Sequence, residues 1–166
     1  MIQYIEKGAG LHQAIRAAGH FLEQRDGAWV ASDPGQVQAI IDSYTLDRAK
    51  AEKSMAVSMH AKRLRDQVTG SVAPGEMASW PIKRAEAEQY NQVGDAASCP
   101  SLYLEAAARG VTVEALVVKV LANAARFIAA EAAIGGTDGK HRDAIAALET
   151  FQAVAEYDFS TGWPEV

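Results

Sequence analysis

The chain has 166 residues, a formal net charge of −5 and one cysteine, and 49% of its residues are hydrophobic. This length allows about one domain or two small ones, and the acidic balance argues against sequence-independent nucleic-acid binding, which needs many Lys or Arg to displace phosphate counterions. No window approaches the roughly 18 uninterrupted apolar residues of a membrane-spanning helix, and the start of the chain lacks the basic and apolar regions of a signal peptide.

The N-terminal segment mixes strand and helix signals. IQYI (2–5) predicts a short strand, and LHQAIRAAG a short helix that stops at Gly19. Asp26-Gly27 predicts a hairpin turn between strands near 20–24 and 28–31, because a two-residue loop needs positive φ and Gly accepts it without steric cost. A two-stranded ribbon is marginal alone, so it needs the first strand, a helix or another molecule to cover one face.

Two further helices follow this module. Ser32 or Asp33 can cap a helix that has Pro34 in its first turn. A second, long helix runs from Leu46 to Thr69 without Gly or Pro, and it has six Lys or Arg against three acids. This pattern indicates a solvated, mildly basic helix that joins two modules.

The break at 70–75 marks a boundary, and four helical segments follow it. They are 74–92, 100–109, 112–134 and 138–155, with Gly135-Gly136 expected to end the third. The third is the strongest prediction, since Val, Leu, Ala, Phe and Ile recur along it at helical spacing. Alanine, 33 of the 166 residues, favours helix throughout the chain and implies a thin core.

Trp80-Pro81 interrupts the first of these segments. Pro81 has no amide to bond the carbonyl of Met77, and its ring disfavours helical geometry at Trp80. The pair therefore predicts a kink or a restart of the helix. We interpret the indole as scaffold, because a lone bulky ring at such a bend most often packs in the core.

These elements predict a mainly α fold with a small N-terminal α+β module. The module contains the β-hairpin and is followed by a long connecting helix and a C-terminal helical bundle. The predicted ranges are 1–44 for the module, 45–70 for the connecting helix, 71–156 for the bundle and 157–166 for an aromatic-acidic tail.

Searches for chemical motifs give no catalytic, cofactor-binding or metal-ligating residue. GAGLHQ and GGTDGKH lack the spacing of phosphate-binding loops and are interpreted as turns. The four histidines are scattered; Asp138 is predicted to cap the last helix, with His141 exposed in its first turn. Cys99 precedes Pro100 at a helix start, where a thiol pKa can fall, although a small residue packed at a turn is commoner. One cysteine forms no internal disulfide, which favours a reducing cytoplasm.

Aromatic residues are the remaining candidates for function. The C-terminal tail has rings outside any helical period, with acids between them, and it either folds back on its own domain or docks on another chain. The predicted partner-binding residues are Phe21, Trp29, Tyr157, Phe159 and Trp163.

GEMASWPIKRAEAEQY, followed by LYLEAAARGVTVEALVVKVLANAARF and the final helix HRDAIAALETF, resembles a domain of small bacteriophage and prophage tail proteins encoded close to the tail fibre. DGAWVASDPGQVQAIIDSY and the basic helix leading into RLRDQV are similar to the front half of such proteins, tail-fibre assembly chaperones among them. The first 20 residues match no named pattern.

The resemblance implies a non-enzymatic protein that binds the tail fibre or tail tip and assists its folding, trimerisation or attachment. It implies that the protein is located in the host bacterial cytoplasm during assembly, or in the tail of the virion. Separate surfaces would then serve the fibre and self-association. A stoichiometric structural subunit of the tail and a host-directed phage regulator are the alternatives, and neither a nucleic acid nor a membrane is an expected partner.

Overall fold

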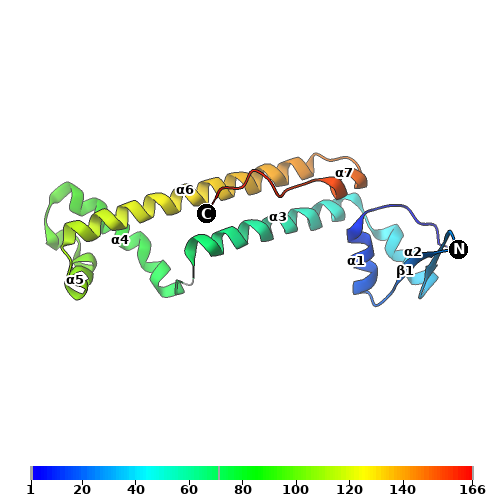
Figure 1. Cartoon of the computed structure of the whole chain (residues 1–166), viewed down its shortest axis with the longest axis horizontal. Coiled ribbons are helices and arrows are strands. Elements are labelled where there is room, and N and C mark those ends of the chain that lie inside the picture. The colour runs from blue at the N-terminus through cyan, green and yellow to red at the C-terminus, as the bar shows by residue number, and fades with distance from the viewer. Residues whose placement is uncertain (1, 71, 166) are drawn as a thin grey trace. The chain divides into compact units, whose positions relative to one another are not determined.

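The structure, a computed structural model, describes residues 2–70 and 72–165. It is 71% helical, with seven α-helices and one two-stranded antiparallel sheet in the described part of the chain (Figure 1). Along the sequence, a small module with a hairpin is followed by a long helix and then by the C-terminal helices. The predicted fold class is therefore confirmed.

The N-terminal module contains α1 (Ala9–Ala17) and a hairpin of β1 (Leu22–Arg25) and β2 (Ala28–Ala31). Asp26 and Gly27 form the turn with φ of 49° and 80°, the left-handed backbone that a two-residue hairpin loop needs. The predicted turn and both predicted strands are confirmed. Most of GAGLHQ lies in α1, so its interpretation as a turn is wrong.

The expected strand at 2–5 is also wrong, because this segment has no regular secondary structure. Side-chain contacts, rather than the backbone hydrogen bonds of a sheet, hold this segment against the module. The amide of Gln3 donates to Oε1 of Gln38 at 2.8 Å, and the ring of Tyr4 lies 4.0 Å from that of Trp29, centroid to centroid. The hairpin therefore gains no third strand from this segment.

α2 (Pro34–Ser43) and α3 (Leu46–Thr69) follow as expected. Asp33 is the cap of α2: its carboxylate accepts hydrogen bonds from the amides of Gln36 and Gly35, both at 3.0 Å. These bonds, with the Gln36 amide first, lower the pKa of Asp33. The limits of α3 agree with the sequence-based prediction at both ends.

α4 (Pro74–Val93) is continuous across Pro81, so the helix does not restart there. A bend of its axis at that point stays a prediction. Trp80 packs edge to face on Phe127 of α6, with ring centroids 5.5 Å apart. This contact supports the interpretation of Trp80 as scaffold, because it joins two helices through their rings.

A short 3₁₀ helix η1 (Ala96–Ser98) and α5 (Pro100–Arg109) connect α4 to α6. Glu86 of α4 accepts hydrogen bonds from the amides of Leu102 and Ser101 at 3.0 and 3.3 Å. A carboxylate is favourable at this end of α5, where amides lack intrahelical partners and the helix dipole is positive.

α6 (Val113–Ala146) is a single helix, so the expected end at Gly135-Gly136 is wrong. The interpretation of GGTDGKH as a turn is wrong for the same reason. Neither glycine adopts the left-handed backbone that ends a helix. A helical glycine costs about 1 kcal/mol relative to alanine, and the buried Ile134 and Ile145 on either side offset that cost.

α7 (Phe151–Glu156) is capped by Thr150, whose Oγ1 accepts a hydrogen bond from the amide of Ala153 at 3.1 Å. The predicted last helix, 138–155, is therefore divided between the end of α6 and α7. Asp138 lies inside α6 and does not cap a helix, which corrects its predicted role.

The chain forms two compact units. Unit 1 comprises Met1–Lys62 and Gly136–Trp163, and unit 2 comprises Arg63–Gly135 and Pro164–Val166. Each unit joins segments that are far apart in the sequence, whereas the predicted domain ranges were consecutive.

Unit 1 has its core among α1, α2, α7 and the start of α3. Its buried side chains include Leu11, Ile15, Val37, Ile41, Tyr44 and Val154. Within this unit α3 and α6 run antiparallel, because Lys50 Nζ donates to the carbonyl of Ala146 at 2.8 Å and Ser58 Oγ donates to Asp138 at 3.3 Å.

Unit 2 has a smaller core in which α4, α5 and α6 meet. In this unit Arg65 of α3 pairs with Glu131 of α6 at 3.0 Å. The buried members of the core are Ala87, Cys99, Leu102, Ala106, Leu116 and Val117. The small side chains among them, two alanines and a cysteine, agree with the thin core expected from composition.

Candidate functional site

The hairpin is the first candidate interaction surface, and its register fixes which backbone groups point outward. Leu22 pairs with Ala31 and Gln24 with Trp29, while the amide of Ser32 donates to the carbonyl of Phe21 at 3.3 Å. Hydrogen-bonded and non-bonded pairs alternate in an antiparallel ladder. The N–H and C=O groups of Leu22 and Gln24 therefore point away from β2, along the free edge of β1.

The two strands differ in how far they are covered. In β1 only Leu22 is partly buried, whereas three of the four residues of β2 are partly buried. Leu22, Trp29 and Ala31 pack against the unit 1 core, and the segment at 2–5 contacts β2 through Tyr4 and Trp29. β1 is thus the open side of the hairpin.

Trp29 belongs to an aromatic cluster with Tyr4 and His12. The hydroxyl of Tyr4 donates to Oε2 of Glu6 at 3.0 Å and lies 3.0 Å from Nε2 of His12. Burial first, and the Glu6 carboxylate second, raise the pKa of Tyr4 to about 12. The cluster fixes Trp29 within its own unit.

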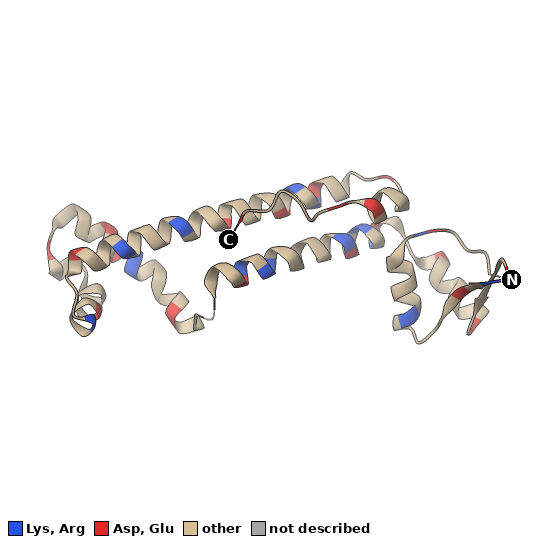
Figure 2. Cartoon of the chain, in the orientation of Figure 1, with Lys and Arg blue, Asp and Glu red and all other residues tan. Residues whose placement is uncertain are grey.

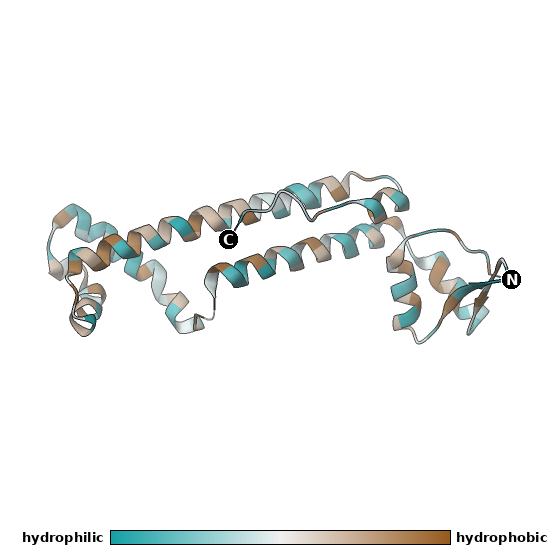
Figure 3. Ribbon diagram, viewed as in Figure 1, coloured by the Kyte–Doolittle hydropathy of each residue, from teal (hydrophilic) through white to brown (hydrophobic). Residues whose placement is uncertain are grey.

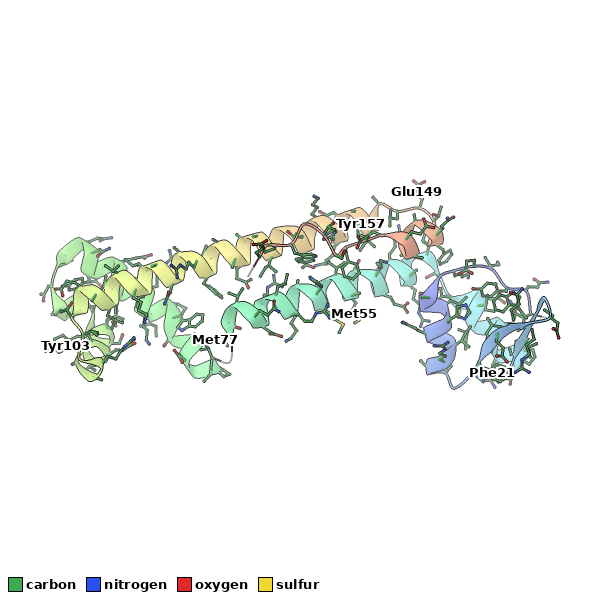
Figure 4. All side chains as sticks on the ribbon, in the orientation of Figure 1. Phe21, Met55, Met77, Tyr103, Glu149 and Tyr157 are labelled. Atoms are coloured by element: carbon green, nitrogen blue, oxygen red, sulfur yellow. The ribbon has the colours of Figure 1, made fainter. Side chains whose placement is uncertain are left out.

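Phe21 differs from Trp29 because it is 45% exposed. It stands next to the start of β1, at the hairpin end of unit 1 (Figure 4). The other four predicted partner-binding rings are all partly buried, so Phe21 has the largest exposed fraction among them. A role for it in binding stays a prediction.

The C-terminal tail folds back on its own unit, which was the first of the two predicted alternatives. Trp163 lies between two histidines, with ring centroids 4.8 Å from His60 and 5.5 Å from His141. Its Nε1 donates to the carbonyl of Phe159 at 2.7 Å. Tyr157 contacts His141 edge to face, with ring centroids 5.8 Å apart. We call residues 157–163 with these two histidines the tail clamp.

His141 is buried in the tail clamp, 6% exposed, so its predicted exposure is wrong. Nε2 lies 3.1 Å from the carbonyl of Thr161, and a carbonyl only accepts hydrogen bonds, so Nε2 carries the proton. Nδ1 lies 2.8 Å from the hydroxyl of Tyr157, within hydrogen-bond distance. Both ring nitrogens are satisfied within the chain.

Sequence reasoning missed this clamp because its members lie on α3, on α6 and in the tail. His60 and His141 are not at a ligand spacing, and no short motif joins them to Trp163. The only signal was the aromatic content of the tail itself. Phe159 and Trp163 both contact His60, so these rings, predicted to bind a partner, lie against one of this chain's own helices.

Cys99 is buried at the start of α5, and burial raises the pKa of its thiol. It therefore packs as a small residue, the commoner of the two interpretations. Glu86 and Glu88 have separate partners, since Glu86 accepts from the amide of Leu102 and Glu88 accepts from Arg84 at 2.7 Å. Among the described side chains no group of three or more His, Cys, Asp or Glu is placed to hold a metal ion.

Unit 2 has a second candidate surface, an open groove between α4 and α6. Its volume is about 440 Å³. The lining residues are Arg84 and Glu88 from α4 and Leu121, Ala124, Ala125, Ile128, Ala129 and Ala132 from α6. Sequence reasoning assigned Leu121, Ala124 and Ile128 to the apolar face of a core helix. In the structure all three line the groove, and Leu121 also packs against the core of unit 2.

Comparisons with known protein families, curated proteins and solved structures find no match to this chain. Over residues 2–70 and 72–165, no helix combines the length and apolar character needed to cross a membrane.

Proposed function

We propose that this chain is a non-enzymatic protein-binding protein whose hairpin receives an extended segment of its partner along β1. The observation that carries this proposal is the open edge of β1. Its outward N–H and C=O groups at Leu22 and Gln24 have no strand beside them in the described chain. An exposed edge of this kind is a template for strand addition.

The stability of the sheet gives the first reason. Two strands are marginal in water, and three or more with one covered face are stable. The core side supplies the covered face through Leu22, Trp29 and Ala31. A partner strand on β1 would supply the third strand, and Phe21 would be partly covered by its side chains.

The resemblance to small phage tail proteins suggests which class of protein the partner belongs to. The partner is then the tail fibre or tail-tip protein, and binding assists its folding, trimerisation or attachment. Chains that are still folding expose strand edges and apolar surface, and such surfaces aggregate. Covering one of those strands on β1 would keep the fibre chain available for assembly.

The test uses the full chain co-expressed with a phage tail-fibre protein, the proposed class of partner. Gln24→Pro removes the outward N–H of β1 and no ladder bond, a position where edge strands tolerate proline. Gln24→Ala is the matched control, since it removes the same side chain and keeps the N–H. We expect the wild-type chain and Gln24→Ala to co-purify with the fibre and raise its soluble trimer, and Gln24→Pro to fail.

Circular dichroism melts of both variants establish that the hairpin module remains folded. Equal capture of the fibre by Gln24→Pro and Gln24→Ala would refute docking on this edge. No effect of the wild-type chain on fibre solubility, trimer yield or attachment would refute the assembly role. Mass spectrometry of mature particles then separates a transient chaperone, which is absent from them, from a stoichiometric tail subunit.

A further inference from the structure

The outward face of α6 is apolar over most of unit 2. Val118 is 67% exposed and Ile128 is 45% exposed. The positions between and around them on the same face are Leu121, Ala122, Ala125, Ala129, Ala132 and Ala133. Figure 3 shows the apolar residues along α6, and Figure 2 shows how few charges interrupt them. Single exposed apolar residues are common on protein surfaces, whereas a contiguous apolar patch marks an interaction site.

Another face of α6 already has its partners in unit 2. Leu116 and Val117 are buried against α4 and α5, and Phe127 packs on Trp80. A helix needs one apolar stripe to pack against one neighbouring layer, and a wider apolar surface calls for further cover. The outward face is therefore apolar but has no neighbouring helix packed on it in the described part of unit 2.

Part of this face lines the groove between α4 and α6, so the surface is concave as well as apolar. Leu121, Ala125 and Ile128 form part of its floor, and the Arg84–Glu88 ion pair of α4 stands on one side. Residues 118–133 of a helix extend over about 24 Å. This length matches about four turns of a second helix laid along the groove, the arrangement in which an amphipathic helix presents its apolar stripe.

The charged residues beside the apolar face indicate which kind of helix could bind there. Lys119 and Arg126 lie seven residues apart on α6, on the side of the apolar face that is opposite α4. Their side chains have no hydrogen-bond or ion-pair partner among the described residues. On the α4 side, Arg84 is neutralised by Glu88 at 2.7 Å. The border of the face is thus positive in a chain of net charge −5.

We infer that this groove binds an amphipathic helix of another protein, with small and aliphatic residues on its inward stripe and Asp or Glu beside Lys119 and Arg126. A second copy of this chain fits less well. In an antiparallel pair through this face, the edge with Lys119 and Arg126 would lie beside the same edge of the partner, so that like charges would meet. The site belongs to unit 2 and shares no residue with the hairpin of unit 1, so it is independent of strand docking on β1.

The test uses two synthetic helical peptides that share a leucine and alanine stripe. One carries Glu along the flank next to that stripe, and the other carries Lys at the same positions. Fluorescence anisotropy measures the binding of each peptide to the full chain at low salt, where surface charges are least screened. We expect the Glu peptide to bind about five- to ten-fold more tightly, the difference that two exposed ion pairs supply.

Three variants sharpen the result. Lys119→Glu/Arg126→Glu should reverse the preference between the two peptides. Ala129→Glu, which places a charge on the groove floor at an exposed helical position, should abolish binding of both. Met59→Glu on α3, at a side chain that is 59% exposed in unit 1, is the matched control and should change neither affinity.

Equal affinities of the two peptides, no binding of either one, or unchanged preference in Lys119→Glu/Arg126→Glu would each overturn the inference. Light scattering of the wild-type chain provides one further decisive outcome. A dimer that Ala129→Glu dissociates would assign the groove to a second copy and exclude the proposed helix. Circular dichroism of each variant establishes that α6 remains helical, which Glu favours at exposed positions.

Discussion

Replacing Trp163 by alanine should release the C-terminal tail from unit 1. The indole stacks against His60 and His141 at 4.8 and 5.5 Å and donates one hydrogen bond of 2.7 Å to Phe159. Each ring pair contributes about 0.5–1.5 kcal/mol beyond burial, and the hydrogen bond contributes about 0.5–1.5 kcal/mol. Because Trp163 is only partly buried, we expect Trp163→Ala to lower the free energy of unfolding by about 2–3 kcal/mol.

Urea denaturation followed by circular dichroism measures this loss, and limited chymotrypsin digestion measures release of the tail through cleavage after Tyr157 or Phe159. Trp163→Phe keeps a ring between the histidines and loses the donor, so it should cost about 1 kcal/mol. Glu165→Ala, at an exposed position outside the clamp, is the control and should have no effect. A change below about 0.5 kcal/mol in Trp163→Ala, with unchanged digestion, would contradict the role of the clamp.

Three further substitutions test other parts of the structure. Gly136→Ala should raise the melting temperature and add about 0.5–1 kcal/mol of stability, because its Cβ would meet open space on a continuous helix; a loss of stability would indicate that the helix ends there. Gly10→Ala should destabilise by about 1–3 kcal/mol, because its Cβ would overlap the hydroxyl of Tyr44, and a neutral result in the same melts would refute that packing. The hydrogen bond from Lys83 holds the pKa of Glu105 below its usual range, so the pair stabilises above the ordinary glutamate pKa and this contribution disappears as pH falls through the lowered one. Glu105→Gln should therefore lose up to about 1 kcal/mol at neutral pH and nothing in acid, and an equal loss at every pH in urea denaturation would contradict this pairing.

The local elements of this fold could be predicted because their signals are local. Asp26-Gly27 specifies a hairpin turn by backbone sterics, and Asp33 specifies a helix start through two amides within three residues. α3 has neither glycine nor proline and ends where the sequence indicates. In each case the stabilising contacts lie within a few residues of one another along the chain.

The errors have non-local causes. Gly135-Gly136 is a reasonable helix end by propensity alone, but burial of Ile134 and Ile145 outweighs a cost of about 2 kcal/mol for two glycines. The segment 2–5 has β-branched and aromatic residues yet forms no strand, because Tyr4 is held by Trp29 from another part of the module. The sequence pattern does not contain these contacts.

The candidate site was predicted in part for the same reason. The hairpin was predicted from its turn chemistry, and Phe21 as a partner-binding ring stays a prediction, while the clamp around His141 depends on three segments that only the tertiary structure brings together. For the rings of the tail, the sequence indicates their unusual placement outside any helical period. It does not indicate that they contact His60 and His141.

His141 shows that a buried helix face can be missed in the sequence when one of its residues is polar. It follows Ile134 by seven positions, which places the two residues on the same face of α6. Ile134, His141 and Ile145 are all buried, so this stretch has a regular inward face even though one of its members is polar. A pattern of apolar residues alone excludes the histidine and misses that face. Counting the histidine as a residue that packs would have placed it correctly.

The width of the apolar surface on α6 is the feature from which the helix-binding groove is inferred. One neighbouring layer covers one face of a helix, and here α4 and α5 bury Leu116 and Val117 while Ile128 remains 45% exposed. The sequence alone shows both faces as one broad stripe, because periodicity records which residues are apolar and not which partner covers them. Once the inward contacts are assigned, Val118 and Ile128 remain 67% and 45% exposed on the outward face, while Leu121 is partly buried against the core of unit 2. Leu121, Ala125 and Ile128 line the groove, and Lys119 and Arg126 follow the same helix beside this face, which is why we assign it to a helix of another protein rather than to additional core.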